Sequence, residues 1–226
     1  MKIGIIGAGR LGGTLAERLA AAGHAPMFGG GASAEEAGYR LGIRATSPAD
    51  AAEFGEVVVL AVPYGAIDGA LAAARPPAGR VIWSCVNALR PDYSGLEVGF
   101  DTSAAEEVAK RAPEARVVAA IPPFAEALAN GDLAYDCGLS PTVFLCGDDP
   151  PAKELIEPLV ADLGAHPVDA GPLAAARLVE PAMMLLVSIA YAGVPRDVGL
   201  RLLERPPAQR ARTGGRPAEE RSTDAE

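Results

Sequence analysis

The sequence predicts an α/β fold: a doubly wound, mainly parallel sheet with a small helical extension at the C-terminal end. Short apolar segments alternate with alanine-rich segments along most of the chain. The first apolar segment, Ile3–Ile6, has no polar alternation, which is typical of a strand buried on both faces. A glycine-rich turn follows this strand directly and opens a helix. Strands that alternate with helices form parallel βαβ units with helices on both faces of the sheet.

The predicted elements follow from this alternation. Strands are expected at Ile3–Ile6, Ala25–Phe28, Val57–Val62, Arg80–Val86, Val117–Ile121 and Thr142–Cys146. Helices are expected at Leu11–Ala22, Ser33–Leu41, Ala49–Phe54, Ala66–Ala74, Ser103–Arg111, Pro150–Leu163 and Pro172–Ala192. Ser33 is expected to cap its helix with Glu36 as the capping-box partner. Pro181 is expected to kink the last helix.

Composition divides the chain into two parts. Residues 1–203 contain the apolar segments and are expected to form one domain, whose helical C-terminal part begins near residue 150. Residues 204–226 consist mainly of Pro, Arg, Gly, Glu and Ser with almost no large apolar residue, and they are expected to form a disordered tail.

The bulk properties exclude several classes of protein. A formal net charge of −9 provides no basic surface for nonspecific nucleic-acid binding. Cys85, Cys137 and Cys146 form no Cys-x-x-Cys pair, and we expect buried, reduced thiols and no metal site. The N-terminus does not resemble a signal peptide, and the apolar stretch Ala182–Val194 is expected to be too short to span a bilayer. The sequence therefore predicts a cytoplasmic protein that binds neither nucleic acid nor membrane.

The turn after the first strand has the Gly-x-Gly-x-x-Gly pattern of dinucleotide-binding proteins. It consists of Gly7, Ala8, Gly9, Arg10, Leu11 and Gly12. The first glycine permits a tight turn, the second lets the backbone approach a pyrophosphate, and the third lets the helix pack closely on the strand. The start of the helix then offers unpaired N–H groups to the pyrophosphate. Because the pattern lies between a strand and a helix, we expect residues 1–203 to bind NAD(P).

The end of the second strand bears on the choice between NADP and NAD. An acidic residue here, about 20 residues after the turn, would bind the ribose hydroxyl of NAD. This sequence has Phe28, Gly29, Gly30, Gly31, Ala32 and Ser33 instead, with no carboxylate to repel the additional phosphate of NADP. Arg10 and Ser33 are candidates to bind that phosphate, while a solvated Arg10 and a capping Ser33 are the alternatives. NADP is the expected cofactor and NAD stays possible.

Further candidates follow the next two strands. Val62, Pro63 and Tyr64 end the central strand, and Asn87 ends its neighbour. At the carboxyl edge of a doubly wound sheet these residues would lie beside the nicotinamide. The alternatives are a packing role for Tyr64 and a turn-forming role for Asn87.

The sequence contains no Ser/His/Asp or Cys/His constellation and no carboxylate pair that demands acid–base chemistry. Hydride transfer between two bound cofactors needs proximity and orientation, and does not require an acid or base from the protein. An oxidoreductase without a catalytic side chain is therefore the leading hypothesis.

Over nearly all of residues 1–203 the sequence resembles the NADPH-dependent coenzyme F420 reductase family. Specific segments are Ser94–Gly99 with Thr102–Glu106, Thr142–Asp149, Val168–Leu173 and Ala176–Pro181. The resemblance implies hydride transfer between NADP(H) and a deazaflavin or flavin, a Rossmann domain and a homodimer. Two segments depart from the family: Gly30–Gly31 replaces Ser/Thr-Arg, and Ile121–Phe124 is shorter than the usual polar loop.

Two other functions stay open at this stage. The chain could reduce a small imine or carbonyl substrate, for which Tyr64 or Lys110 would have to donate a proton, although Lys110 is expected on an outer helix. It could also be a noncatalytic NADP(H) sensor. For the leading hypothesis, the acceptor ring is expected between Pro122–Phe124 and a wall formed by Met183–Leu185.

Overall fold

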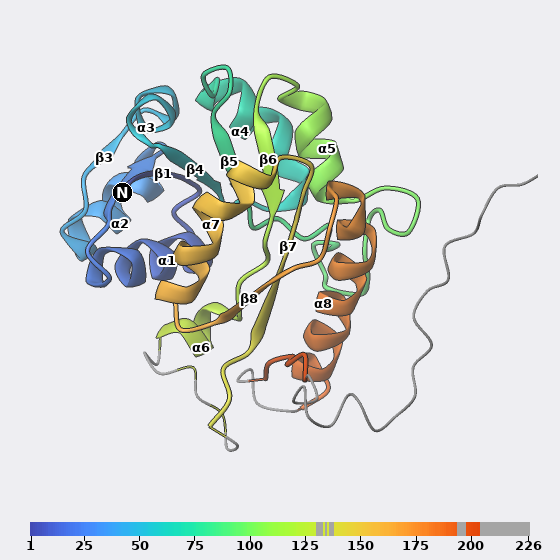
Figure 1. The fold of residues 1–226 in the computed structure, drawn as a ribbon. Helices are drawn as coiled ribbons and strands as arrows, with labels where there is room; N and C mark the ends of the chain where they lie inside the picture. Colours follow the sequence, from blue (N-terminus) through green and yellow to red (C-terminus); the bar gives the residue numbers. More distant parts are fainter. Residues whose placement is uncertain (130–132, 134, 136–137, 194–197, 204–226) are drawn as a thin grey trace, which may run out of the picture.

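The computed structural model describes residues 1–129, 133, 135, 138–193 and 198–203. Within these residues eight strands form one sheet in the order β3-β2-β1-β4-β5-β6-β7-β8 (Figure 1). The strands are β1 (Lys2–Ile6), β2 (Ala25–Gly29), β3 (Ala45–Thr46), β4 (Val57–Leu60), β5 (Val81–Ser84), β6 (Arg116–Ala119), β7 (Thr142–Gly147) and β8 (His166–Asp169). The Rossmann-type α/β fold expected from the sequence is confirmed.

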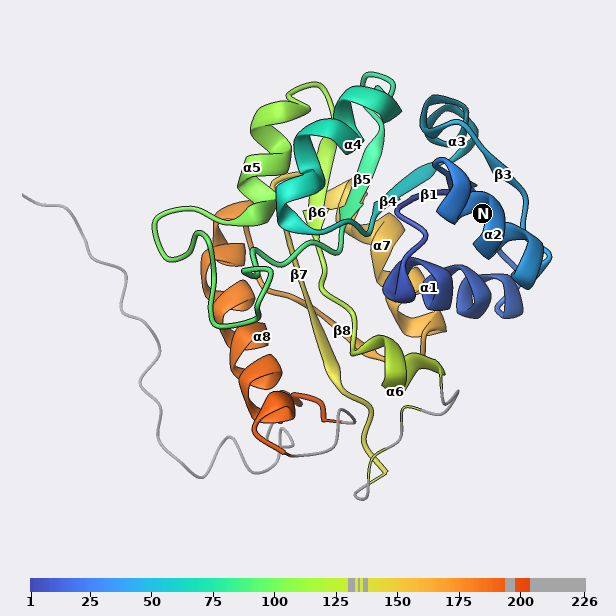
Figure 2. The same ribbon diagram turned by 180° about the vertical axis from the view of Figure 1, so that it is seen from behind.

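Helices connect the strands and cover both faces of the sheet (Figures 1 and 2). They are α1 (Arg10–Ala21), α2 (Ala32–Leu41), α3 (Pro48–Phe54), α4 (Ile67–Ala74), α5 (Ala104–Arg111), α6 (Ala125–Ala129), α7 (Pro150–Asp162) and α8 (Ala176–Tyr191). Two 3-10 turns, η1 (Tyr64–Ala66) and η2 (Leu173–Ala175), lead into α4 and α8. Asp149 caps α7 and Ser103 caps α5 through their side chains.

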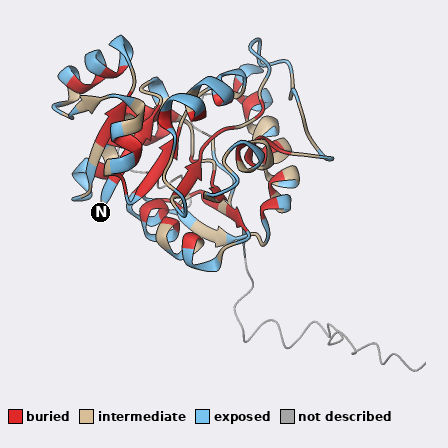
Figure 3. Cartoon of the chain, turned by 90° about the horizontal axis from the view of Figure 1, so that it is seen from above, coloured by how far each residue is buried: buried red, intermediate tan, exposed pale blue. Residues whose placement is uncertain are grey.

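The sheet separates two apolar cores. Ile3 and Ile5 of β1 pack on the face covered by α1, α2, α6 and α7, whereas Ile6 packs on the face covered by α3, α4 and α5. Side chains of a strand alternate between faces, so a strand buried on both sides must be apolar throughout. Figure 3 shows the buried residues concentrated in the sheet and on the inward sides of the helices.

The last part of the chain is less purely helical than the sequence predicts. β7 runs antiparallel to β6, and β8 then pairs with β7 in parallel. β8 was not predicted, because His166 and Asp169 are exposed at its ends and Pro167 interrupts the apolar pattern. The two-residue β3 and the five-residue α6 are too short to produce a periodic signal.

The final helix is longer than the apolar stretch recognised in the sequence. η2 and α8 together form a helix over Leu173–Tyr191, with mean hydropathy 1.7, that is long and apolar enough to cross a membrane by length and composition alone. The expectation that this segment is too short is therefore wrong, because the helix begins well before Ala182. Pro181 lies inside α8, as expected. The predicted tail lies outside the described residues.

Candidate functional site

The candidate site lies where the direction of the chain across the sheet reverses. From β1 the chain passes to α1 on one face, whereas from β4, the neighbour of β1, it passes to α4 on the other face. In open α/β sheets ligands bind outside the carboxyl ends of the strands at this point. The glycine turn after β1 lies at this crevice.

The three glycines of the turn have different surroundings. Gly7 has a φ of +105°, and a Cβ there would lie 2.3 Å from the carbonyl oxygen of Ala61. A Cβ on Gly12 would lie 1.8 Å from the carbonyl oxygen of Gly7, so α1 contacts the turn directly. A Cβ on Gly9 would meet nothing within 4 Å. Gly9 is also the N-cap of α1 and supplies no side-chain cap. The first N–H groups of α1 therefore face open space, which fits a pyrophosphate.

A cavity of about 430 Å³ adjoins this turn. It is lined by Ile6, Gly7, Ala8, Gly29, Gly30, Ser33, Ala34, Pro48, Val62, Gly65, Ala66, Gly69 and Ala70. The structure thus brings together five of the predicted residues: Gly7, Ala8, Gly30, Ser33 and Val62. The other lining residues were not among the predicted site residues: Ile6, Gly29, Ala34, Pro48 and the four from η1 and α4. The signal for the latter was a pair of small residues, Gly65-Ala66, repeated four positions later as Gly69-Ala70, which leaves one helix face without bulk.

The end of β2 differs from the prediction in one respect. Ser33 does not cap α2: Gly31 is the N-cap, and its carbonyl oxygen accepts hydrogen bonds from the N–H groups of Ala34 and Glu35. The helix begins before Ser33 because these backbone bonds already close its first turn. Glu36 consequently has no capping-box role. Ser33 lines the cavity instead, and no charged side chain is among the lining residues.

Arg10 is the first residue of α1, and its side chain is 67% exposed. Its guanidinium forms an ion pair with Glu126 of α6. Such an exposed pair contributes little to stability. Arg10 therefore lies beside the N–H groups of the turn. Its exposed guanidinium can exchange Glu126 for an anionic ligand.

The predicted nicotinamide contacts have distinct environments. Pro63 is exposed, and Tyr64 is half-buried in η1. Partial burial, together with the nearby carboxylate of Glu107, raises the pKa of Tyr64, so its phenol is neutral at neutral pH. The Nδ2 group of Asn87 donates a hydrogen bond to the backbone carbonyl of Glu180, 3.3 Å away, while its Oδ1 is buried without a partner among the described residues. Asn87 thus connects the segment after β5 with α8.

The expected acceptor wall is only partly formed. Met183 and Met184 are half-buried and Leu185 is exposed. Met184 and Pro181 contribute to a second, open cavity of about 390 Å³, whose other lining residues are Leu96, Glu97, Val98, Gly99 and Phe100. This cavity lies between α8 and the segment that precedes α5.

Comparisons with known proteins agree with this geometry. The sequence model of the family described as "NADP oxidoreductase coenzyme F420-dependent" matches residues 2–88. This range contains β1 to β5, the glycine turn and every residue that lines the 430 Å³ cavity. The chain therefore resembles the F420-dependent NADP oxidoreductases.

Solved structures share the fold. A provisionally named F420-dependent NADP-reductase from Arthrobacter sp. FB24 has 24% identity and a TM-score of 0.80, over 90% of this chain and 100% of that chain. The hypothetical protein SMa0349 from Sinorhizobium meliloti has 29% identity and a TM-score of 0.71, over 91% and 96% of the two chains. An imine reductase from Aspergillus terreus in complex with NADPH4 has 17% identity and a TM-score of 0.61, over 85% and 63%.

Other chemistry is not apparent in the described part of the chain. It contains no group of three His, Cys, Asp or Glu residues that could hold a metal ion. Cys85 and Cys146 are free and buried, and burial raises the pKa of each thiol. Cys137 lies outside the described residues. Lys110 lies on the exposed side of α5, as predicted, and pairs with Glu107.

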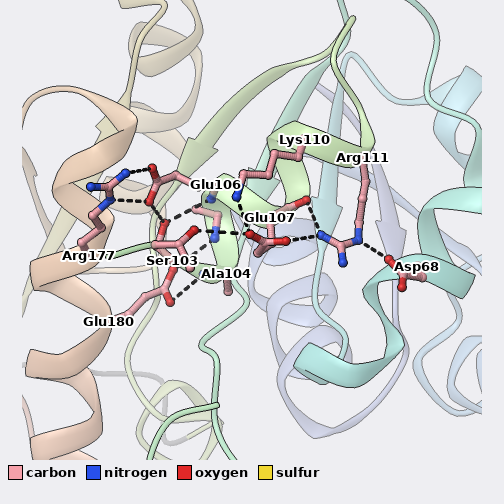
Figure 4. Close-up of polar contacts among 11 residues, drawn as sticks. Asp68, Ser103, Ala104, Glu106, Glu107, Lys110, Arg111, Arg177 and Glu180 are labelled. Carbon is pink, nitrogen blue, oxygen red and sulfur yellow. Dashed lines mark hydrogen bonds and ion pairs between the residues drawn. The ribbon is translucent and has the colours of Figure 1, made fainter. Parts of the chain in front are cut away.

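A buried carboxylate near the site was not predicted. Glu180 of α8 is 1% exposed, and burial raises its pKa to about 7, against the effect of backbone N–H groups that donate to it. Figure 4 shows this side chain beside the first residues of α5. The available signal was a single acidic residue in the apolar part of a helix, directly before Pro181.

We predict that Gly9→Val abolishes dinucleotide binding and leaves the fold intact. Valine would occupy the open space over the first turn of α1, and the φ of −68° at this position suits any residue. Calorimetric titration with NADPH and thermal melting measure the two effects. Gly12→Val is the contrasting variant. Its Cβ would collide with the carbonyl oxygen of Gly7, so the melting temperature should fall markedly. Wild-type affinity in folded Gly9→Val would place the binding site elsewhere.

We predict that Glu180→Gln removes a pH dependence of stability between pH 5 and 8. Between the ordinary pKa of 4.5 and the raised pKa of about 7, the folded protein holds a proton on Glu180 that the unfolded chain has released, so wild-type stability should fall as pH rises across this range, by on the order of 3 kcal/mol. The carboxylates whose pKa is lowered, such as Glu107 at about 2, titrate below this window. Urea unfolding at several pH values measures the slope, and equal slopes in both proteins would contradict the prediction.

Proposed function

We propose that the protein is an NADP(H)-dependent oxidoreductase that transfers hydride between the nicotinamide and a deazaflavin or flavin acceptor. The observation that carries the proposal is the glycine turn, in which Gly9 leaves the start of α1 open beside a 430 Å³ cavity. The residues fit a dinucleotide: N–H groups for the pyrophosphate, and an uncharged cavity of small side chains for the adenosine. The matched family supports the choice of reaction.

The preference for NADP over NAD rests on the end of β2. No carboxylate is among the residues that line the cavity there, so its lining offers no two-oxygen acceptor for the ribose hydroxyl pair and no negative charge to repel a phosphate. Gly30, Ser33 and the exposed Arg10 are the groups proposed to lie near that phosphate. NAD binding with lower affinity is compatible with this arrangement.

The protein's own residues bind and orient in this proposal, and none donates a proton. When bound, the nicotinamide supplies or accepts the hydride. Val62, Pro63, Tyr64 and Asn87 border its proposed place at the carboxyl ends of β4 and β5. Lys110 is 63% exposed and engaged with Glu107, which argues against it as the acid of an imine or carbonyl reductase. Tyr64 stays the alternative proton donor for such a reaction, and the choice of hydride transfer between two cofactors rests on the matched family.

Steady-state reduction of coenzyme F420 by NADPH tests the proposal, with FMN as the alternative acceptor. Turnover with F420 that is faster than with FMN is expected. Binding of NADPH without transfer to either acceptor would overturn the proposed reaction and favour a sensor. Turnover with a cyclic imine instead would establish a small-substrate reductase.

We further propose that the protein is a cytoplasmic homodimer joined through α8. Leu178, Ala182, Leu185 and Ile189 follow the 4-3-4 spacing of a helix–helix seam, and Leu178 and Leu185 are 70% and 60% exposed. A second copy would cover this stripe with its own α8. The seam spacing argues for a helix partner over a lipid bilayer, and buried Glu180 on the same helix argues in the same direction.

We predict that Arg10→Ala lowers NADPH affinity about 10-fold or more and leaves NADH affinity nearly unchanged. A charge-assisted hydrogen bond to the additional phosphate contributes about 1.5–3 kcal/mol. Titration of both cofactors measures the difference. Arg116→Ala, at the amino end of β6, is the matched control and should change neither affinity. Equal losses for NADPH and NADH would indicate that Arg10 contacts the shared pyrophosphate.

We predict that Leu185→Glu converts the dimer into a monomer. A charge in the centre of the apolar stripe cannot be desolvated without a partner. Sedimentation velocity measures the mass, and Tyr39→Glu, at a 94% exposed aromatic on α2, is the control that should stay dimeric. A wild-type monomer, or wild-type protein that floats with phospholipid vesicles, would rule out the proposed use of α8.

A further inference from the structure

Glu180 is a buried carboxylate whose observed partners are backbone groups. Its Oε2 accepts a hydrogen bond from the N–H of Ala104, 2.9 Å away, and its Oε1 accepts one from the N–H of Ala105, 3.1 Å away. The N–H of Ala88 also donates to this carboxylate. Arg177, three residues before Glu180 in α8, is bonded to Glu106 instead (Figure 4). The carboxylate therefore links α8 with the start of α5 and with Ala88 in the segment that follows β5.

The backbone of Glu180 makes a second connection to the same place. Its carbonyl oxygen accepts the hydrogen bond from Asn87 Nδ2. A carbonyl oxygen can only accept, so the amide of Asn87 must present its NH₂ group to α8. This fixes the orientation of the amide and leaves Oδ1 as a buried acceptor without a partner among the described residues. An unsatisfied buried acceptor is destabilising, and a functional role is one of the explanations for such a group in a folded protein.

Asn87 and Ala88, in the segment that follows β5, are thus both held by one residue of α8. The carboxyl end of β5 lies beside that of β4, because Leu60 pairs with Ser84. Val62 and Tyr64 follow β4 at this edge, and the proposed function places the nicotinamide against them. The N–H of Glu97 donates a hydrogen bond to the carbonyl oxygen of Ala88, so the segment that precedes α5 is also joined to Ala88.

We infer that Glu180 is a positioning residue for the nicotinamide end of the cofactor site, acting through Asn87 and Ala88. The inference rests on the proposed function. Asn87 contacts the nicotinamide carboxamide. The carboxylate of Glu180 holds the N–H of Ala88, and its backbone carbonyl holds the side-chain amide of Asn87 in the orientation that permits this contact. The cavity proposed for the adenosine is lined by residues of β2, α2 and α4, and none of the residues bonded to Glu180 is among its lining residues.

A purely structural role for Glu180 makes a different prediction. In that case any weakening of the contact between α8 and α5 would affect the whole site. Arg177 provides the matched control, because its two bonds to Glu106 also join α8 to α5 but do not involve the end of β5. Arg177→Gln removes this second link and leaves Asn87 and Ala88 in place.

The test compares NADPH with its adenosine fragment, 2′,5′-ADP, by calorimetric titration of the full-length protein. Glu180→Gln keeps the size of the side chain and leaves one carbonyl oxygen for the three N–H groups. We expect it to weaken NADPH binding about 3- to 10-fold, as for the loss of one hydrogen bond, and to leave 2′,5′-ADP binding unchanged. Arg177→Gln should change neither affinity.

A second variant keeps the test decisive if Glu180→Gln does not fold. Asn87→Leu removes the amide and keeps Glu180, and it should show the same selective loss for NADPH. Equal losses for NADPH and 2′,5′-ADP, or wild-type NADPH affinity in either variant, would overturn the positioning role. If the wild-type protein binds neither ligand, the proposed function fails, and this outcome differs from every outcome that overturns the inference alone.

Discussion

The contact between the first turn of α1 and the glycine turn is the constraint on which the candidate site depends. Gly12 lies so close to the carbonyl oxygen of Gly7 that no side chain fits between them. This contact directs the N-terminal end of α1, with its unpaired N–H groups, at the crevice between β1 and β4. The adjoining cavity follows, because small residues from β2, α2 and α4 meet the same turn. The site is thus formed mainly by backbone and by the absence of side chains.

The second organising interaction lies at the other end of the crevice. α8 is joined to the Rossmann core by a buried carboxylate and backbone N–H groups, and at its surface by the bidentate pair of Arg177 with Glu106. A carboxylate in this position depends on its hydrogen bonds, since an uncompensated buried charge is costly. The same helix presents an apolar stripe to solvent. α8 therefore relates the candidate site to the surface proposed for dimerisation.

Much of the fold could be predicted because its determinants are local. The strands β1 and β4 are continuously apolar, and the glycine pattern of residues 7–12 is contained within one turn. The predicted cap at Ser33 was wrong, because backbone hydrogen bonds to Gly31 close the first turn of α2 without a side-chain cap. β8 was missed because an edge strand with exposed ends lacks the apolar pattern. The bonds of Glu180 to Ala104 and Ala105 join residues far apart in the sequence, and only the packing of α8 against α5 brings them together.

A crystal structure of the protein grown with NADP tests the central claim most directly. The account predicts pyrophosphate oxygens within hydrogen-bonding distance of the N–H groups at the start of α1, over Gly9. It also predicts the adenosine in the cavity lined by Gly30, Ser33 and Gly69. A dinucleotide bound away from the carboxyl edge of β1 and β4, or a turn left unoccupied at saturating NADP, would contradict the account.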